Sequence, residues 1–522
     1  MATTPHILWV DDEIDLLKPH ILLLETKGYA VDSVSNGSDA VEKVKDRPYD
    51  IILLDEQMPG MGGLDTLAAI KDASPEVPVV MVTKSEEEDL MEEALGGQIS
   101  DYLTKPVNPS QILLTCKRLL ERSRLQSEKT SQRYMQRFAQ ISQELNRPLS
   151  HTEWIDVYTE LMRYDIELEG DEGARQILND QFAEANRTFG AYIQREYPYW
   201  IEAADDGDTE DRPVLSHEII PTYVAPQMKQ DHPVIFFLID CMRYDQWLAF
   251  EEILFPYFAM EKTFHYGILP TATPYARNAI FSGMLPRDIA ARHPRIWEEG
   301  EDDEHSRNRH EAAFLEQLMK REFRDEVRTR YHKLIGKEQG QDFASNVGAL
   351  LQHDLSAVVI NFVDILAHSR SESDVLKELA PDERAYRALT RTWFEHSWLL
   401  DAFKELAEKD CTIVLTTDHG IIRSLHPTKV IGDRHTSTAL RYKYGRNLKA
   451  DERHAIFVED PEAFGLPQTS MMTNYIIAKE DYYFVYPTNY HKYVDLYNDT
   501  LQHGGASMEE MILPVVTMTP KG

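Results

Sequence analysis

The 522-residue chain is too long for one hydrophobic core, and its length is typical of about three domains. Its 88 acidic and 55 basic side chains give a net charge of −33, which repels a phosphate backbone and argues against sequence-specific DNA binding. The longest apolar run, Val234 to Ile239, has only the length of a strand, so we expect no membrane insertion.

The three cysteines, Cys116, Cys241 and Cys411, are far apart in the sequence and offer no disulfide framework. The N-terminal residues also lack the basic and apolar segments of a signal peptide. We therefore predict a cytoplasmic protein with reduced thiols.

Residues 1–122 alternate short β-branched apolar runs with segments of helical periodicity. This alternation predicts a flavodoxin-like (βα)5 domain with a doubly wound parallel sheet. The expected strands are HILWV, AVDSV, YDIILL, PVVMV and SDYLTK.

Acidic side chains come at the ends of two of these strands. Asp55 ends the third strand, and Asp11 and Asp12 follow the first, so all three should meet at the carboxyl edge of the sheet. Their mutual repulsion favours a hard cation such as Mg²⁺ between them. Thr83 ends the fourth strand and Lys105 the fifth, where a hydroxyl and an ammonium group can bond a phosphoryl group on Asp55.

This order of strand-end residues closely resembles the receiver domains of response regulators, and the segment MPGMGGLDTL after Asp55 strengthens the match. The resemblance implies phosphorylation by a sensor histidine kinase and a Mg²⁺ shell completed by the carbonyl of Gln57. It also implies that Tyr102 is the switch aromatic. Phosphorylation adds roughly −1.5 to −2 charge, so we expect it to pull Thr83 inward, change the face around Tyr102 and produce a symmetric homodimer.

Residues 123–205 have apolar side chains at three- and four-residue spacing, which predicts a helical bundle of three helices that acts as a connector. The acidic segment 204–213 is predicted to be an exposed linker. Residues 214–522 are predicted to form a larger α/β domain, because strand-like runs return between helical segments. These runs are VIFFLID, AVVINFVD, TIVLTTDH and MILPVVTM.

Six side chains of the third region have the chemistry and placement of metal ligands. Five follow three strand-like segments, the sixth lies in the segment QHGGAS near the C-terminus, and one carboxylate–histidine pair is a helical turn apart. Asp and His ligands without Cys favour Zn²⁺, with Mn²⁺ as the second choice. The six are Asp240, Asp364, His368, Asp418, His419 and His503.

The segment LPTATPYARNAIFSG (269–283) contains the candidate nucleophile. Thr273 precedes Pro274, a pattern typical of a helix N-cap with proline at the first helical position. A helix N-terminus offers N–H groups to an anion, and a bound metal lowers the pKa of a hydroxyl group. Thr271 is the alternative nucleophile.

Residues 230–522 resemble the alkaline phosphatase superfamily, and specifically its PglZ branch. The resemblance favours Thr273 over Thr271, because the spacing to Ser282–Gly283 and to Arg277 matches the superfamily. It implies two zinc ions, whose ligand sets are Asp240, Asp418, His419 and the Thr273 oxygen for the first, and Asp364, His368 and His503 for the second.

A threonine is not convertible to formylglycine, so sulfatase activity is disfavoured and phosphoryl transfer through a phosphothreonine remains. The sequence PTAT (270–273) matches the PTxT pattern of nucleotide pyrophosphatase-phosphodiesterases, which favours diesters. We predict substrate contacts from the nucleophile's helix and from the basic segment 432–447, although a solvated loop would have the same composition. These residues are Arg277, Asn278, Arg441 and Tyr442.

Over the whole chain, the order of receiver, helical bundle and PglZ domain resembles response regulators linked to type IX secretion in Bacteroidetes. The resemblance implies a zinc phosphodiesterase acting on cyclic or linear oligonucleotides, a cognate sensor kinase, and contact with a sigma factor or the secretion motor. The alternative is a zinc-binding scaffold for protein contacts in which catalysis is vestigial.

Overall fold

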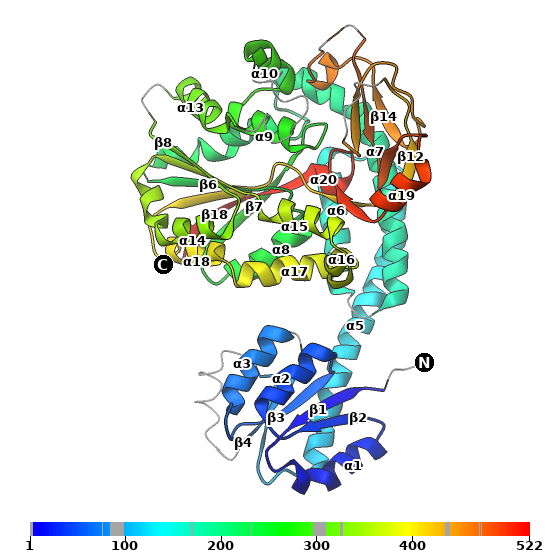
Figure 1. Ribbon diagram of the computed structural model, residues 1–522, viewed down its shortest axis with the longest axis vertical. Helices are drawn as coiled ribbons and strands as arrows, with labels where there is room; N and C mark the ends of the chain where they lie inside the picture. The colour runs from blue at the N-terminus through cyan, green and yellow to red at the C-terminus, as the bar shows by residue number, and fades with distance from the viewer. Residues whose placement is uncertain are drawn as a thin grey trace. The chain divides into compact units, whose positions relative to one another are not determined.

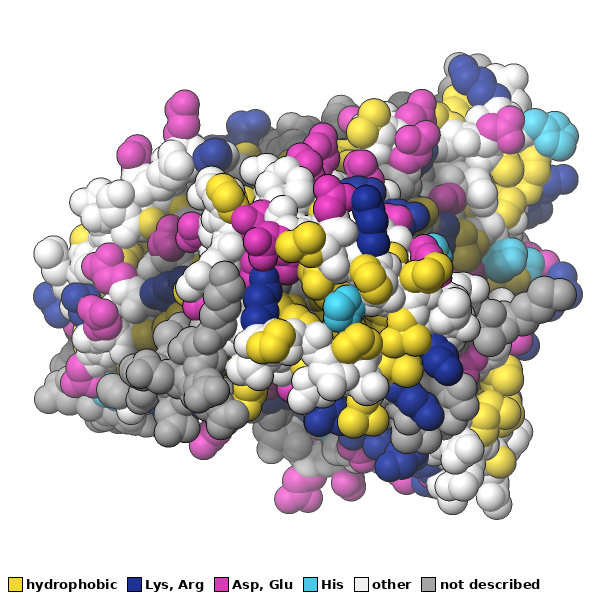
Figure 2. All heavy atoms as spheres, turned by 90° about the horizontal axis from the view of Figure 1, so that it is seen from below, with side chains coloured by type: hydrophobic (Ala, Val, Ile, Leu, Met, Phe, Trp, Pro, Cys, Tyr) yellow, Lys and Arg dark blue, Asp and Glu magenta, His cyan; other side chains and the backbone are white. Residues whose placement is uncertain are grey.

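The computed structural model describes residues 4–521 except 76, 84–98, 169–170, 231, 296–308, 324–326, 434–438, 469 and 471. Contacts within the chain divide it into two compact units, Met1–Arg133 and Tyr134–Gly522. Among the helices in the described ranges, none is long and apolar enough to cross a lipid bilayer. On the face seen in Figure 2, acidic and basic side chains are interspersed.

The first unit contains a parallel sheet with the strand order β2-β1-β3-β4-β5, as the flavodoxin-like prediction requires (Figure 1). Its central strands are buried at every position because their sequences are apolar on both faces. The strands are β1 His6–Val10, β2 Ala30–Val34, β3 Ile51–Asp55, β4 Val79–Thr83 and β5 Asp101–Thr104. The helices are η1 Ile14–Leu17, α1 Lys18–Thr26, α2 Gly37–Asp46, α3 Gly63–Ala73 and α5 Pro109–Leu145, the last of which continues into the second unit.

The connector helices belong to the second unit, and their buried side chains are part of the same hydrophobic core as the large sheet. The two helices that follow α5 are α6 His151–Glu167 and α7 Glu172–Asp205. A capping box begins α6: Glu153 N donates to Ser150 Oγ over 3.3 Å, and Ser150 N donates to Glu153 Oε2 over 2.8 Å. The sequence prediction of helices in this region is therefore confirmed.

The segment 204–213 is only partly the exposed linker that its acidic composition predicts. Helix α7 continues to Asp205, and the Arg212 side chain is buried with its guanidinium 2.6 Å from Glu218 Oε1. This ion pair fixes the end of the segment to the following domain.

The second unit is built on a six-stranded sheet with the order β7-β18-β10-β6-β9-β8. The last four strands in this order are parallel, whereas β18 is antiparallel to both of its neighbours. Helices cover both faces, with α9, α10 and α13 on one and α8, α14, α17 and α18 on the other (Figure 1). The strands are β6 Val234–Ile239, β7 Phe258–Tyr266, β8 Thr329–Leu334, β9 Leu355–Ile360, β10 Thr412–Thr416 and β18 Ile512–Pro520.

The other elements of the second unit surround this sheet. The short strands are β11 Ile422–Ser424, β12 His426–Lys429, β13 Tyr442–Gly445, β14 Ala455–Val458, β15 Asn474–Ala478, β16 Tyr482–Val485 and β17 Thr500–Gln502. The α-helices are α8 Tyr244–Leu254, α9 Thr273–Ser282, α10 Pro286–Arg292, α13 Glu311–Glu322, α14 Lys337–Ser345, α15 Phe362–Glu372, α16 Asp374–Leu379, α17 Glu383–Glu395, α18 Trp398–Leu406, α19 Tyr490–Tyr497 and α20 Met508–Met511. The short turns of helix are η2 Ser216–Glu218, η3 Ile220–Val224, η4 Gln227–Gln230, η5 Val347–Gln352 and η6 Glu462–Phe464.

Candidate active and metal-binding sites

The first site lies at the carboxyl edge of the receiver sheet, where the strand-end carboxylates meet as expected. Asp11, Asp12 and Asp55 each present an oxygen within 4.8 Å of the others. The Lys105 ammonium is 2.9 Å from Asp55 Oδ2 and 3.0 Å from Asp11 Oδ2. An oxygen-only ligand set of this kind fits a hard divalent cation.

The charge balance of this site depends on one lysine. Burial, together with the negative charge of Asp11, raises the pKa of Asp55 above its ordinary value, although the bond from Lys105 opposes the rise. A cation among the three carboxylates would offset the same repulsion. The residues present therefore fit a bound metal ion.

The predicted switch residues surround this carboxylate cluster. The Thr83 hydroxyl donates to the carboxylate of Glu56, and the Lys105–Pro106 peptide bond is cis. Tyr102 is half-buried on β5, and Gln57 is exposed two residues after Asp55. The neighbouring segment 84–98 is outside the described residues, so the expected dimerisation face is described only in part.

The second site lies at the carboxyl edge of the large sheet, where the six predicted ligands fall into two sets. Asp240 follows β6 and the Asp418–His419 pair follows β10, and these three present ligand atoms within 4.8 Å of one another. The other set contains the residues after β9 and β17. Its members are Asp364, His368 and His503. The sets are the two that the resemblance implies.

Thr273 and Thr271 have different surroundings. Thr273 Oγ1 is 2.9 Å from His419 Nε2, within the first set. The fully buried Thr271 hydroxyl donates to Gly505 O over 2.7 Å and accepts from Gly504 N over 3.2 Å. Helix α9 begins at Thr273 with Ala272 as its N-cap, one residue earlier than predicted, and the Thr273 hydroxyl contacts His419.

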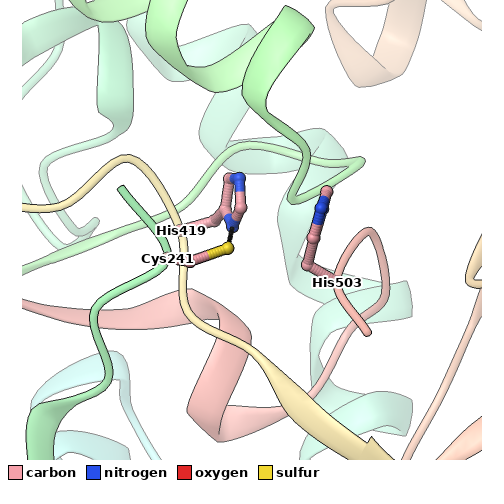
Figure 3. Close-up of side chains that lie close together, drawn as sticks. All are labelled: Cys241, His419 and His503. Atoms are coloured by element: carbon pink, nitrogen blue, oxygen red, sulfur yellow. Dashed lines mark hydrogen bonds between the residues drawn. The ribbon is translucent and has the colours of Figure 1, made fainter. Parts of the chain in front are cut away.

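The second ligand set is more exposed than the first. Asp364 and His368 are one turn apart on α15, and His368 Nε2 is 3.2 Å from Asp364 Oδ1. The ring of His503 stacks on that of His419 with centroids 4.3 Å apart, so the sets adjoin (Figure 3). Gly504 has a φ of +111°, and a Cβ there would lie 2.6 Å from the Tyr442 ring, which explains the glycine after His503.

Cys241 is a residue of this site that the sequence prediction missed. Its Sγ is 3.4 Å from Asp364 Oδ1 and 3.5 Å from His419 Nδ1, and Figure 3 shows it beside His419. Its position directly after Asp240 in the sequence could have indicated that Cys241 lies in the site.

Arg277 is fully buried and is bonded to two of the predicted metal ligands. Its guanidinium pairs with Asp240, is 3.1 Å from Asp418 Oδ2, and is 3.6 Å from the buried Glu311 Oε1. A side chain enclosed in this way gives no support to the prediction that Arg277 contacts substrate directly. Glu311 was not anticipated, because it comes from α13, well beyond the α9 segment in the sequence.

The other three predicted substrate residues are also internal. Asn278 is buried and donates to Pro274 O over 2.9 Å within α9. Arg441 is fully buried and pairs with Glu510, and Tyr442 is buried with its ring against that of Tyr275. These placements do not support substrate contact, and residues 434–438 of the same basic segment lie outside the described ranges.

The carboxylates of the first set are buried and repel one another. Burial, together with the charges of Asp418 and Asp364, raises the pKa of Asp240 well above its ordinary value. Burial alone would also raise the pKa of Asp418, but His419 and Arg277 outweigh it and hold that pKa low. Asp240 Oδ1 is buried without a hydrogen-bond partner among the described residues, as expected of an atom that ligates a metal ion. The Asp and His donors fit a divalent metal.

Comparison with known proteins identifies this domain. Residues 219–518 match the family described as the BREX system PglZ alkaline phosphatase-like domain. The chain belongs to this PglZ family. Residues 7–117 match the response regulator receiver domain, and residues 124–201 match the PorX response regulator linker domain. The chain therefore has a PorX-type architecture, in which a receiver precedes a linker and an alkaline phosphatase-like PglZ domain.

The curated relatives match the receiver. "Transcriptional regulatory protein ResD" of Bacillus subtilis is 35% identical over 117 residues, which are 22% of this chain and 48% of the relative. "Transcriptional regulatory protein BaeR" of Escherichia coli is 37% identical over 127 residues, 24% of this chain and 52% of the relative. The chain thus spans about half the length of these relatives.

Solved structures also align with the receiver portion. The chemotaxis protein CheY4 of Vibrio cholerae is 29% identical with a TM-score of 0.21, over 22% of this chain and 99% of that one. A CheY-like receiver domain protein of Methanospirillum hungatei is 28% identical with a TM-score of 0.22, over 23% of this chain and 96% of that one.

Proposed function

We propose that the chain is a response regulator, phosphorylated on Asp55, whose PglZ domain is a two-zinc phosphodiesterase with Thr273 as nucleophile. The observation that carries the proposal is the gathering of six Asp and His side chains in two adjoining sets, with the Thr273 hydroxyl 2.9 Å from His419. Mixed nitrogen and oxygen ligands favour zinc over magnesium at this site, whereas the receiver's three carboxylates favour magnesium.

The expected reaction is a double displacement. Bound zinc would lower the pKa of the nucleophilic hydroxyl and stabilise charge on the phosphoryl oxygens. Thr273 Oγ forms a bond to phosphorus while the bond from phosphorus to the leaving oxygen breaks; Oγ gives up its proton, and the leaving oxygen takes up a proton to become the alcohol. The oxygen of a water molecule then bonds to the phosphorus of the phosphothreonine, the Thr273 O–P bond breaks, and a proton from that water restores the threonine hydroxyl. The first-turn N–H groups of α9 favour the anionic substrate.

The roles of the two threonines follow from their partners. The Thr271 hydroxyl is hydrogen-bonded to the backbone of Gly504 and Gly505, whereas the Thr273 hydroxyl contacts His419 of the first ligand set. Arg277 then acts on the ligands, by holding Asp240 and Asp418 together. These contacts support Thr273 as the nucleophile.

The receiver completes the proposal. Lys105 already bonds Asp55, so it is placed to pair with a phosphoryl group there, and Thr83 and Tyr102 would respond as in other receivers. We propose homodimerisation on phosphorylation, a cytoplasmic location, cyclic or linear oligonucleotides as substrates, and a role in type IX secretion through a sigma factor or the secretion motor. The PorX-type architecture supports this assignment.

The proposal is tested by metal analysis together with hydrolysis of bis-p-nitrophenyl phosphate. We expect two zinc ions per chain and a loss of more than about 10³-fold in kcat/KM for Thr273→Val. Thr273→Ser should keep measurable activity because it keeps a hydroxyl. Thr271→Ser, which also keeps its hydroxyl, is the matched control and should stay near wild type.

Three results would contradict the proposal: full activity of Thr273→Val, loss of activity in the Thr271→Ser control alone, or bound zinc without turnover of any diester. The last result would instead support a PglZ domain that is a zinc-binding scaffold for protein contacts.

A further inference from the structure

One side chain of the connector is bonded to the turn that follows a predicted zinc ligand. Asn186 lies on α7 and is 5% exposed. Its Oδ1 accepts from Met508 N over 2.8 Å, and its Nδ2 donates to Glu509 Oε2 over 2.9 Å. Both polar atoms of the amide are therefore used by the turn that begins at His503.

This turn is connected to the first ligand set by direct backbone contact. Gly420 N, directly after His419, donates to Glu510 O over 3.3 Å. A Cβ on Gly420 would lie only 1.9 Å from Glu509 O, so the two backbones touch. A displacement of Glu509 must therefore displace the residue that follows His419.

The same turn is connected to the second ligand set and to the nucleophile's segment. Gly505 N donates to Glu510 Oε1 over 2.8 Å, which fixes the residues just after His503. Thr271, two residues before Thr273, is bonded to Gly504 and Gly505. The turn 503–511 thus contacts the backbone around both sets and the nucleophile.

The contact between Asn186 and the turn lies at the edge of a cavity. The cavity has a volume of about 530 Å³ and is lined by α7 together with Arg243, Arg423 and Glu509. Burial raises the pKa of Glu509, and the bond from Asn186 opposes the rise. Loss of the amide would leave the buried Glu509 carboxylate without this donor.

We propose that Asn186 is a positioning residue through which the connector helix sets the geometry of the metal-binding residues His419 and His503. The proposal rests on the function proposed above and adds a way in which the connector helix could regulate that site. The connector joins the receiver to the PglZ domain along the chain, so a rearrangement of α7 would reach both ligand sets through one amide.

The test exchanges the amide group of Asn186 and the carboxylate group of Glu509 between the two positions. Asn186→Asp keeps the acceptor for Met508 N–H but places a carboxylate against Glu509. Glu509→Gln alone keeps an acceptor for Asn186. The double variant Asn186→Asp with Glu509→Gln restores the bond with its direction reversed. Asn179→Ala is the control, since Asn179 is an exposed asparagine two turns earlier on α7 that lines the same cavity.

Each variant of the full chain is measured for zinc affinity by chelator competition and for amide hydrogen exchange in peptides covering 503–511. We expect Asn186→Asp to weaken zinc binding roughly tenfold and to speed exchange in this segment several-fold. The double variant should recover most of both effects, and Glu509→Gln and Asn179→Ala should stay near wild type.

Unchanged zinc affinity and exchange in Asn186→Asp would overturn the inference. So would a loss that the double variant does not restore, because general destabilisation has no reason to be repaired by the exchange of partners. If wild-type protein binds no zinc or hydrolyses no diester, the proposed function fails, and the exchange measurement still decides whether Asn186 positions the turn.

Discussion

The receiver site and the PglZ site are both formed where carboxylates follow parallel strands, yet they balance their charge differently. In the receiver, the cation is the Lys105 ammonium, whose side chain is 15% exposed and bonded to Asp11 and Asp55. In the PglZ domain, it is the Arg277 guanidinium, which is 0% exposed and enclosed by Asp240, Asp418 and Glu311.

The difference fits two kinds of chemistry. A flexible, partly exposed lysine can exchange a carboxylate partner for a phosphoryl group that arrives from solvent. A buried arginine fork has no exposed atoms for this purpose and instead fixes the spacing of the carboxylates around it. We therefore infer that the receiver's cation takes part in switching, whereas the PglZ domain's cation maintains the ligand geometry.

The largest expected effect separates the two sites completely. Asp55→Asn should abolish phosphorylation by a small-molecule phosphodonor, because the chain loses its carboxylate acceptor. Thr273→Val should be phosphorylated like wild type, since Thr273 belongs to the other site. Intact-mass measurement checks both, and residual phosphorylation of Asp55→Asn would mean that another residue is the acceptor.

The next effect concerns the buried cation. Arg277→Met should lower the free energy of unfolding of the second unit by about 3–5 kcal/mol, because it leaves buried carboxylates without a counter-charge. Saturating zinc should restore part of the loss. The loss in free energy of unfolding would be measured by a denaturant titration in which the hydrogen exchange of second-unit peptides is monitored.

The matched variant in the receiver is Lys105→Met. It should lower the free energy of unfolding of the first unit by only about 1 kcal/mol, measured on first-unit peptides in the same experiment. Saturating magnesium should compensate for part of it. Equal losses for the two variants would contradict the contrast drawn between the two cations.

The most gradual effect depends on pH. His265, on β7, is fully buried, neither ring nitrogen has a hydrogen-bond partner among the described residues, and burial lowers its pKa to about 3. Below about pH 6.5 the unfolded chain binds a proton on this imidazole that the folded chain does not. The stability of the second unit should therefore fall as the pH decreases from about 6.5 towards 3, with a slope of at most ~1.4 kcal/mol per pH unit from this residue.

His265→Phe should remove this part of the slope, measured by denaturant titration of chelator-treated protein so that metal loss does not contribute. A slope identical to that of wild type would show that His265 does not stay neutral in the folded protein.

The sequence was sufficient to predict what depends on strand ends. Asp55, Asp240 and Asp418 each follow an apolar run, and parallel strands bring such residues to one edge. The i, i+4 spacing of Asp364 and His368 likewise predicted their contact on α15.

Long-range pairs could not be predicted in this way. Arg277 lies one turn after Thr273, but its direction depends on Glu311 and on carboxylates from distant strands. Arg441 was predicted to be a substrate contact because its segment is basic, yet its partner Glu510 is 69 residues away. Asn186 and Glu509 are 323 residues apart. No local pattern contains such information.

Gly420 has a consequence for how related sequences can vary. Any side chain at this position would push the turn after His419 away from the carbonyl of Glu509. The two segments are therefore expected to change together or not at all, and glycine at this position should persist wherever the backbone contact is retained. A search of relatives for a glycine directly after the Asp-His pair would identify the proteins that keep this close contact between the segments of His419 and Glu509.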